Sequence, residues 1–298
     1  MTSDALDRRD HGADAMHRRL RVERFASADI AWEMAYAEPD ARLAGLVQRM
    51  CGYREWSASP LQRIQPPYSG LPLIIGFGEP IRVSGDSYAL DHVSSFVAGL
   101  DIAPAQTEGV GQQAGIQFDL TPLGAARFLD MPLESLAYGL ASLDDLIGVE
   151  GRRLAQRLGE AADWAERLAL TEAFALERIT SHPAPPPLVT ALWRRLIASR
   201  GQTDIAALAE DAGVSRKHLT QQFRRWTGLP PSLYARVLRF DRAVEQIRAR
   251  PTAIDWAQLA GGCGYYDQPH FNRDFRAFTG LTPTAFVAAL RPGGGVVI

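Results

Sequence analysis

Polar side chains of the kinds that bond to DNA bases form two groups near the C-terminus of this 298-residue chain. Glutamine and asparagine can form two hydrogen bonds with adenine, arginine and lysine bond to guanine, and threonine contacts the thymine methyl group. The two groups therefore predict readout of base edges in a DNA major groove. The residues assigned to this role are Lys217, Thr220 and Gln221 in the first group and Gln268, Asn272 and Arg273 in the second.

Arginines beside these groups predict contacts with the DNA backbone. A guanidinium that bonds to a phosphate adds affinity and fixes the register of the protein, but it carries no sequence information. The residues assigned to phosphates are Arg216, Arg224, Arg225 and Arg276.

The segments that carry the two groups repeat one pattern. Residues 208–234 read LAEDAGVSRKHLTQQFRRWTGLPPSLY, and residues 259–286 read LAGGCGYYDQPHFNRDFRAFTGLTPTAF. With one residue inserted after the glycine, ten positions are identical at an offset of 51 and then 52. Such a period is typical of one supersecondary unit that is used twice.

Each copy has the spacing of a helix-turn-helix. A short helix is expected to end at Gly213 or Gly264, where a residue without a Cβ takes the left-handed conformation. After a short turn, Ser215 or Asp267 is expected to cap a second helix, which ends at a Thr-Gly-Leu sequence followed by proline. An ordinary pair of amphipathic helices is the alternative, but it does not need the turn, the cap and the duplication together.

The repeats and their connection, residues 232–248, resemble the DNA-binding domain of AraC/XylS-type transcriptional regulators. The second copy is the more diagnostic, with an aromatic residue after glycine, an Asp cap, His-Phe, Phe-Arg and Gly-x-x-Pro. The resemblance covers residues 188–290 and implies two helix-turn-helix units that a long helix holds in successive major grooves. A stripe of apolar residues at spacings of three and four is expected to bury that helix. Its members are Leu233, Val237, Phe240, Val244 and Ile247.

One departure from the pattern concerns the first helix of the second unit, which contains Gly261 and Gly262. Each glycine inside a helix costs about 1 kcal/mol relative to alanine. The sequence therefore predicts a looser second unit that contributes less specificity than the first.

The charge distribution favours the same part of the chain for DNA. The whole chain has a formal net charge of −2. From Leu188 onward we count 15 Lys/Arg and 8 Asp/Glu, a net charge of +7, whereas the remainder has 17 and 26, a net charge of −9. The attraction for phosphates is thus expected in the C-terminal third alone.

The N-terminal part has a different sequence pattern, with short apolar runs separated by turn residues. We expect a disordered tail over residues 1–28 and a β-rich domain over 29–130, with strands of four to seven residues and turns at 76–80, 84–87 and 109–115. Many short strands at this spacing suggest a small barrel or sandwich. The segment is similar to the cupin-like sensor domain of many AraC/XylS-type regulators, which implies an α+β two-domain fold and a small-molecule effector.

An effector pocket in such a barrel would be mostly apolar, with a few polar groups. The alternative is that its aromatic residues only form the core. The candidate pocket residues are Trp32, Tyr36, Tyr53, Trp56, Tyr68, Phe77, Tyr88, Phe96 and Phe118.

The sequence offers no recognisable catalytic site. The β-rich segment has one histidine, His92, and no His-x-His pair, so we expect neither metal nor cofactor. No nucleophile elbow, His-Glu-x-x-His or phosphate-binding glycine loop is present. Cys51 is expected on a helix, either as a small core residue or as a sensing thiol, and Cys263 falls in the other domain, so a disulfide is not expected.

Residues 131–181 have helical periodicity. These helices either pair two protomers, as the resemblance suggests, or pack against the barrel of their own chain. Residues 182–187 (HPAPPP) are expected to form a proline linker before the DNA-binding domain, and 291–298 to form a tail. No apolar run approaches 18 residues, and the N-terminus has no hydrophobic segment before its charged residues. Neither a membrane span nor secretion is therefore expected, and the compartment predicted is the cytoplasm.

Taken together, these features predict a sequence-specific transcription regulator that acts on promoter DNA and is controlled by a small molecule. The family resemblance also implies contact with RNA polymerase and pairing into a homodimer. Two alternatives stay open, a constitutive regulator with a structural N-terminal domain and an enzyme with an attached DNA-binding module.

Overall fold

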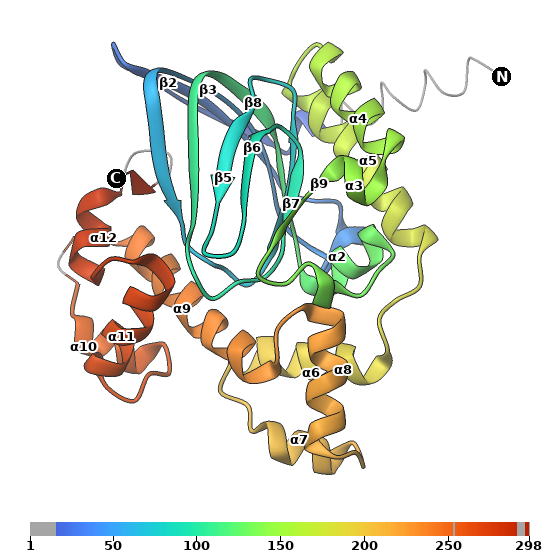
Figure 1. Ribbon diagram of the computed structural model, residues 1–298, viewed down its shortest axis with the longest axis vertical. Helices are drawn as coiled ribbons and strands as arrows, with labels where there is room; N and C mark the ends of the chain where they lie inside the picture. Colours follow the sequence, from blue (N-terminus) through green and yellow to red (C-terminus); the bar gives the residue numbers. More distant parts are fainter. Residues whose placement is uncertain (1–15, 253, 291–295, 298) are drawn as a thin grey trace.

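The computed structural model describes residues 16–252, 254–290 and 296–297. The fold is α+β, with an antiparallel sheet in the N-terminal part and a C-terminal domain of helices (Figure 1). This agrees with the two-domain fold class expected from the sequence.

The sheet is built around two long strands that pair along most of their length, β3 (Val47–Gln65) and β8 (Ala105–Leu120). They span 19 and 16 residues, so the expectation of uniformly short strands was wrong. The main strand order is β1-β2-β3-β8-β4-β7-β9, and every strand pair is antiparallel. The other strands are β1 (Leu20–Ala26), β2 (Ile30–Ala37), β4 (Leu71–Gly76), β5 (Ile81–Ser84), β6 (Ala89–Val93), β7 (Phe96–Ala98), β9 (Leu140–Ser142) and β10 (Val296–Val297).

The turn expected at residues 109–115 is instead the middle of β8. Glycines suggested the turn, but glycine inside a strand also marks a bulge or a close approach. Gly111 has a φ of 76° opposite a register shift between Ser57 and Leu61, and a Cβ at Gly115 would lie 2.7 Å from the Tyr53 hydroxyl oxygen. The glycines therefore bend the long strand without ending it.

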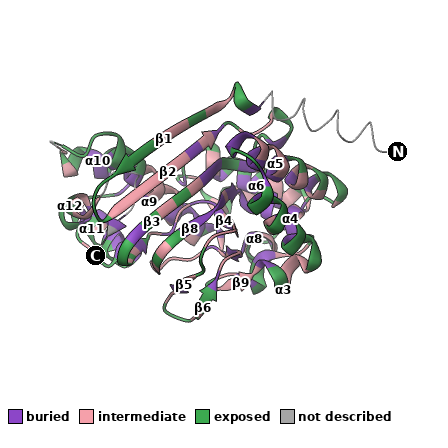
Figure 2. Ribbon diagram, turned by 90° about the horizontal axis from the view of Figure 1, so that it is seen from above, coloured by how far each residue is buried: buried purple, intermediate pink, exposed green. Residues whose placement is uncertain are grey.

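Both predicted tails contain strands. Leu20–Ala26 pairs with β2, and Figure 2 shows β1 at the edge of the sheet. At the other end, Val296–Val297 pairs with β3. The N-terminal segment is largely polar, but pairing with a neighbouring strand needs only a few inward apolar side chains such as Leu20 and Val22. Residues 1–15, 291–295 and 298 lie outside the described part.

One face of the sheet is covered by helices of the same part of the chain. Alternate residues of a strand point to opposite faces, and the covered face carries Met50, Ile116 and Phe118, all buried in the main core. Trp164, at the start of α5, lies against Gly52 so closely that a Cβ there would be 2.5 Å from the indole. The covering helices are α2 (Pro122–Leu129), α4 (Val149–Glu160) and α5 (Trp164–Ser181).

The segment 131–181 is not helical throughout. Leu133–Ser135 forms a single 3-10 turn, η2, and Leu140–Ser142 is strand β9, which precedes α3 (Leu143–Ile147). Large apolar residues of these helices are turned inward, because Leu154, Leu158 and Leu168 are all buried in this chain's own core. The arrangement favours packing on the sheet over pairing of protomers.

Cys51 lies on β3, not on a helix as expected, and its side chain is buried. Burial raises the pKa of its thiol to about 11. Because the thiolate is the reactive form, this environment makes Cys51 a poor sensing residue.

The C-terminal domain begins after the proline-rich segment and consists of helices only, up to residue 289 (Figure 1). The long connecting helix predicted at 232–248 is α9, and its apolar stripe faces the core. None of the described helices is long and apolar enough to cross a membrane. The helices are α6 (Pro187–Ala198), α7 (Ile205–Asp211), α8 (Arg216–Thr227), α9 (Pro231–Ala249), α10 (Trp256–Gly262), α11 (Gln268–Thr279) and α12 (Pro283–Ala289).

The two parts of the molecule share one continuous core and a hydrogen-bond network. Ser69, in the loop between β3 and β4, donates from its backbone N–H and its hydroxyl to Asp241 of α9, over 3.0 and 2.6 Å. The Ser69 carbonyl accepts from the hydroxyl of Tyr234 at 3.0 Å, and that hydroxyl accepts from the Trp193 indole at 3.0 Å. The proline-rich segment therefore does not separate two independent bodies.

Candidate DNA interface

The local geometry of both units is that of a helix-turn-helix. Gly213 and Gly264 follow the first helices with φ of 64° and 84°, as their left-handed roles require. The Ser215 hydroxyl accepts from the backbone N–H of His218 at 3.1 Å, and the Asp267 carboxylate accepts from that of His270 at 2.7 Å. The predicted turns and caps are confirmed.

The long helix α9 fixes the two second helices, α8 and α11, through buried aromatic residues. Phe240 of α9 lies with its ring centroid 5.3 Å from that of Phe275 and 4.8 Å from that of Phe278, both on α11. At the other end of α9, the rings of Tyr234 and Phe223 of α8 are 5.9 Å apart. Because all five rings are buried, the spacing of the two units is set by packing.

The outward faces of α8 and α11 carry the side chains predicted to contact DNA. On α8 these side chains are exposed except for Thr220, which is half-buried. On α11 they are exposed except for Gln268, which is also half-buried. The exposed members are Arg216, Lys217, Gln221, Arg224, Arg225, Asn272, Arg273 and Arg276.

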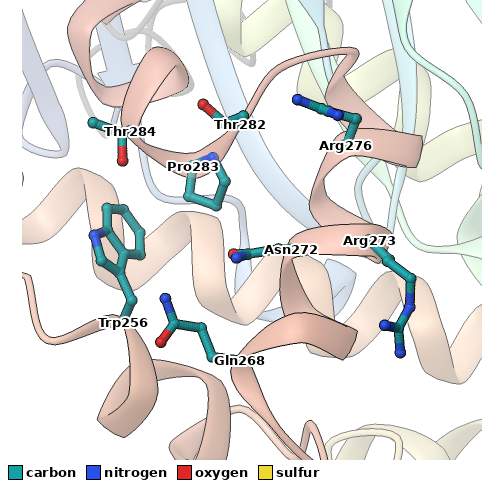
Figure 3. Close-up of a pocket in the computed structure, with 8 residues that line it drawn as sticks. All are labelled: Trp256, Gln268, Asn272, Arg273, Arg276, Thr282, Pro283 and Thr284. Atoms are coloured by element: carbon teal, nitrogen blue, oxygen red, sulfur yellow. The ribbon is translucent and has the colours of Figure 1, made fainter.

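The second unit has a hollow of about 370 Å³ on its outer side. Figure 3 shows the amides of Gln268 and Asn272 directed into it, whereas the guanidinium of Arg273 points away from its centre. Arg276 lines the same hollow. All four predicted contact residues of this unit thus border one surface depression.

The hollow is completed by residues that the sequence reasoning missed. Trp256 closes one side of it from the first residue of α10, and Thr282, Pro283 and Thr284 close the other from the start of α12 (Figure 3). The available signal was the repeat itself, because Trp256 occupies the position of Ile205 in the first copy. An indole where the repeat has an aliphatic side chain marks a difference between the two units.

Ion pairs join α8 and α11, the predicted recognition helices, to other parts of the chain. Asp274 is buried on α11 and accepts from the guanidinium of Arg236 on α9 at 2.7 Å, which fixes α11 in position. On α8, Arg224 donates from Nε to the carboxylate of Glu134 at 2.8 Å. Glu134 belongs to η2 of the N-terminal part, so that part of the chain holds a predicted phosphate-binding residue.

Gly261 and Gly262 occupy the last positions of α10, as the sequence indicated. A Cβ at either position would meet nothing within 4 Å. No packing constraint therefore requires glycine here. The two glycines make the end of α10 less stable than alanines at the same positions would.

The structure does not gather the candidate effector residues in one pocket. Phe118 belongs to the main core, whereas Phe96 packs with Tyr53 and Tyr88 in a separate small cluster. The remaining five side chains each have a different environment. Trp32 stacks on Phe25, Trp56 is 42% exposed, the Tyr68 hydroxyl donates to Asp119 at 2.7 Å, and Phe77 packs near Trp164, while Tyr36 is half-buried beneath Arg21.

Among the residues that the structure describes, no three His, Cys, Asp or Glu side chains are grouped so as to hold a metal ion. The polar groupings that do occur, such as that of Arg49 and Tyr68 on Asp119, are internal hydrogen-bond networks.

Residues 208–289 match a family model described as a helix-turn-helix domain. The chain is similar to the HTH-type transcriptional regulator GbdR of Pseudomonas aeruginosa, with 26% identity over 161 residues that cover 49% of this chain and 40% of the relative. It is similar to the transcriptional activator RhaR of Escherichia coli, with 29% identity over 153 residues that cover 49% and 54%. It is also similar to the regulator GlxA of Rhizobium meliloti, with 30% identity over 176 residues that cover 55% and 52%. The match thus spans about half the length of these relatives.

Solved structures to which the chain is similar include ToxT from Vibrio cholerae, with a TM-score of 0.47 and 10% identity over 82% of this chain and 98% of that chain. The C-terminal domain of AraT, a response regulator from Geobacillus stearothermophilus, matches with a TM-score of 0.30 and 21% identity over 33% and 82%.

Proposed function

We propose that this protein is a transcription regulator that binds promoter DNA sequence-specifically, because its C-terminal region belongs to the AraC-type helix-turn-helix family. The observation that carries the proposal is the pair of recognition helices, α8 and α11, fixed by one helix and exposing side chains suited to base edges. Two such helices would enter successive major grooves.

The proposed assignment of residues to bases or to phosphates follows their order along each helix. Lys217, Thr220 and Gln221 of α8 would read bases in one groove, and the corresponding residues of α11 would read the next. Arginines farther along each helix would bind phosphates. Trp256 and Thr284, at the rim of the second hollow, would contact the backbone there.

The N-terminal part would control this activity through its contacts with the DNA-binding helices. The Glu134–Arg224 pair and the Ser69–Asp241 bonds join the two parts in the described arrangement. A small effector would shift the balance between this arrangement and one with α8 free, to the extent that it binds one of them more tightly. The cytoplasm is the proposed compartment, because a promoter-binding protein acts where the chromosome lies.

Selection of bound sequences from a randomised duplex pool tests the proposal. The full chain is the appropriate sample, because the helical domain shares its core with the sheet. We expect two short motifs about one helical turn apart, and a Lys217→Ala/Gln221→Ala variant should lose only one of them. A single motif in the parent protein would limit base readout to one unit, and no enrichment at all would overturn sequence-specific binding.

Arg224 provides a separate prediction about the N-terminal contact. Arg224→Ala should weaken binding equally on all sequences and reduce the slope of log affinity against log salt by about one. Glu134→Gln should strengthen binding by up to about fivefold, since an exposed pair contributes at most about 1 kcal/mol. Fluorescence anisotropy at several salt concentrations measures both effects, and an unchanged slope for Arg224→Ala would reject the phosphate contact.

A further inference from the structure

A second hollow of about 370 Å³ lies between the sheet and its helical cover, far from the recognition residues in sequence. Arg54 of β3, Gln112 of β8 and Arg167 of α5 line it, together with Phe77 and Glu79 from the loop after β4. Its walls are therefore largely polar and contain two guanidinium groups.

Arg167 is a buried cation without a carboxylate partner. Only 7% of the residue is exposed, and its Nε and Nη2 donate to the carbonyls of Leu158 and Ala161 at 2.8 and 2.5 Å. Its guanidinium lies 5.3 and 5.2 Å from the ring centroids of Phe77 and Trp164. Within residues 16–252, 254–290 and 296–297 no ion pair to Arg167 is present, although buried charges are normally paired.

Arg54 adds a second positive charge at the same place. Its guanidinium lies 5.8 Å from the Trp164 ring that also contacts Arg167, and it makes no hydrogen bond or ion pair with any described residue. Burial lowers the pKa of Arg167, and the nearby charge of Arg54 lowers that pKa further. The charges of Asp163, Glu166 and Glu33 act in the opposite direction on the pKa of Arg167, but none of these carboxylates forms an ion pair with it. An anion between the two guanidiniums would remove their mutual repulsion.

We propose that this hollow binds a small organic anion, with a carboxylate or phosphate group held between Arg54 and Arg167. Guanidinium groups suit such oxyanions because they donate several hydrogen bonds in a fixed plane. Glu79, the one acidic residue of the lining, and the amide of Gln112 accept from a hydroxyl or ammonium group elsewhere on the ligand. The ligand is therefore polar and has donor groups as well as its negative charge.

The position of the hollow connects it with regulation. Arg167 lies on α5, whose last residue, Ser181, precedes the proline-rich segment that leads into α6 of the DNA-binding domain. An anion that fixes the start of α5 against the sheet is thus placed to act as the effector, a role that rests on the proposed function. Binding of the anion itself does not rest on it.

Calorimetric titration of the full chain without DNA tests the site directly, with inorganic phosphate, succinate and malate as probes and putrescine as a cationic control. We expect saturable binding of at least one anion and none of putrescine. Arg54→Gln should weaken that binding about tenfold or more, the loss expected for hydrogen bonds to a charged group. Preference for phosphate over the carboxylates, or the reverse, identifies the oxyanion.

Two variants separate loss of the site from loss of the fold. Gly159→Met places a side chain into the hollow from α4, where a Cβ meets only Phe77 at 3.6 Å, so it should abolish binding and leave the melting temperature unchanged or higher. Arg153→Gln, on the exposed side of α4, should bind like the parent. Absence of binding by all three anions, or equal binding by Arg54→Gln and the parent, would overturn the site. Binding that leaves DNA affinity unchanged would retain the site but remove its effector role.

Discussion

Phe240→Ala is expected to lower the free energy of unfolding by about 3–5 kcal/mol, the cost of removing a large buried aromatic side chain. The ring is fully buried and packs against Phe275 and Phe278 of the second recognition helix. The cavity would lie between α9 and α11, so the second unit should loosen first. Binding to the DNA motif of that unit should weaken more than binding to the other.

Urea unfolding followed by circular dichroism measures the loss of stability, and anisotropy with single-motif duplexes measures the loss of each contact. Phe240→Leu is the matched control, because a hydrophobic replacement that retains most of the volume usually costs less than about 1.5 kcal/mol. Equal weakening at both motifs in Phe240→Ala would mean that α9 does not couple more strongly to the second unit than to the first.

The second large effect is expected at Arg273. Arg273→Ala should weaken binding to the preferred sequence by about 1–3 kcal/mol, roughly 5- to 150-fold, and relax discrimination at one base pair. The side chain is exposed on α11 and makes no ion pair with any described residue, so its removal should cost affinity without disturbing the fold. Its guanidinium is free to reach the edge of a guanine.

Anisotropy on the selected site and on duplexes with each base changed in turn distinguishes base readout from general attraction. Arg276→Ala is the matched control on the same helix, with a uniform loss and a salt slope reduced by about one. If Arg273→Ala weakened binding to all duplexes by the same factor, Arg273 would be assigned to the backbone instead.

The helix-turn-helix units could be predicted from sequence because their signals are local. Gly213, Ser215 and the apolar pair Leu219 and Phe223 lie within eleven residues, and each has one conformational preference that agrees with the others. The same agreement recurs one repeat later. Local signals of this kind fix turns, caps and the buried side of a short helix without knowledge of the rest of the chain.

The sheet could be predicted only in outline. Gly109, Gly111 and Gly115 indicated a turn, and only the partner strand β3 shows that they belong to one bent strand. Likewise, Phe118 and Tyr53 were grouped as pocket candidates by type, yet strand alternation places them on opposite faces. Face and register depend on pairing between distant segments, which one sequence does not reveal.

The candidate sites differ in the same way. The contact residues of α11 follow from their spacing along one helix, whereas Trp256 joins them only through tertiary packing. The hollow at Arg54 and Arg167 joins residues 113 positions apart, and nothing in either local sequence distinguishes these arginines from the others.

The short strand β10 has a consequence for the mechanics of the molecule. The second helix-turn-helix unit leaves the core along α9 and returns to it where Val296 pairs with Ile64 of β3. The unit is therefore connected to the rest of the molecule at both of its ends, through α9 and through β10. Any large movement of this unit relative to the sheet must therefore first break the pairing of Val296–Val297 with β3.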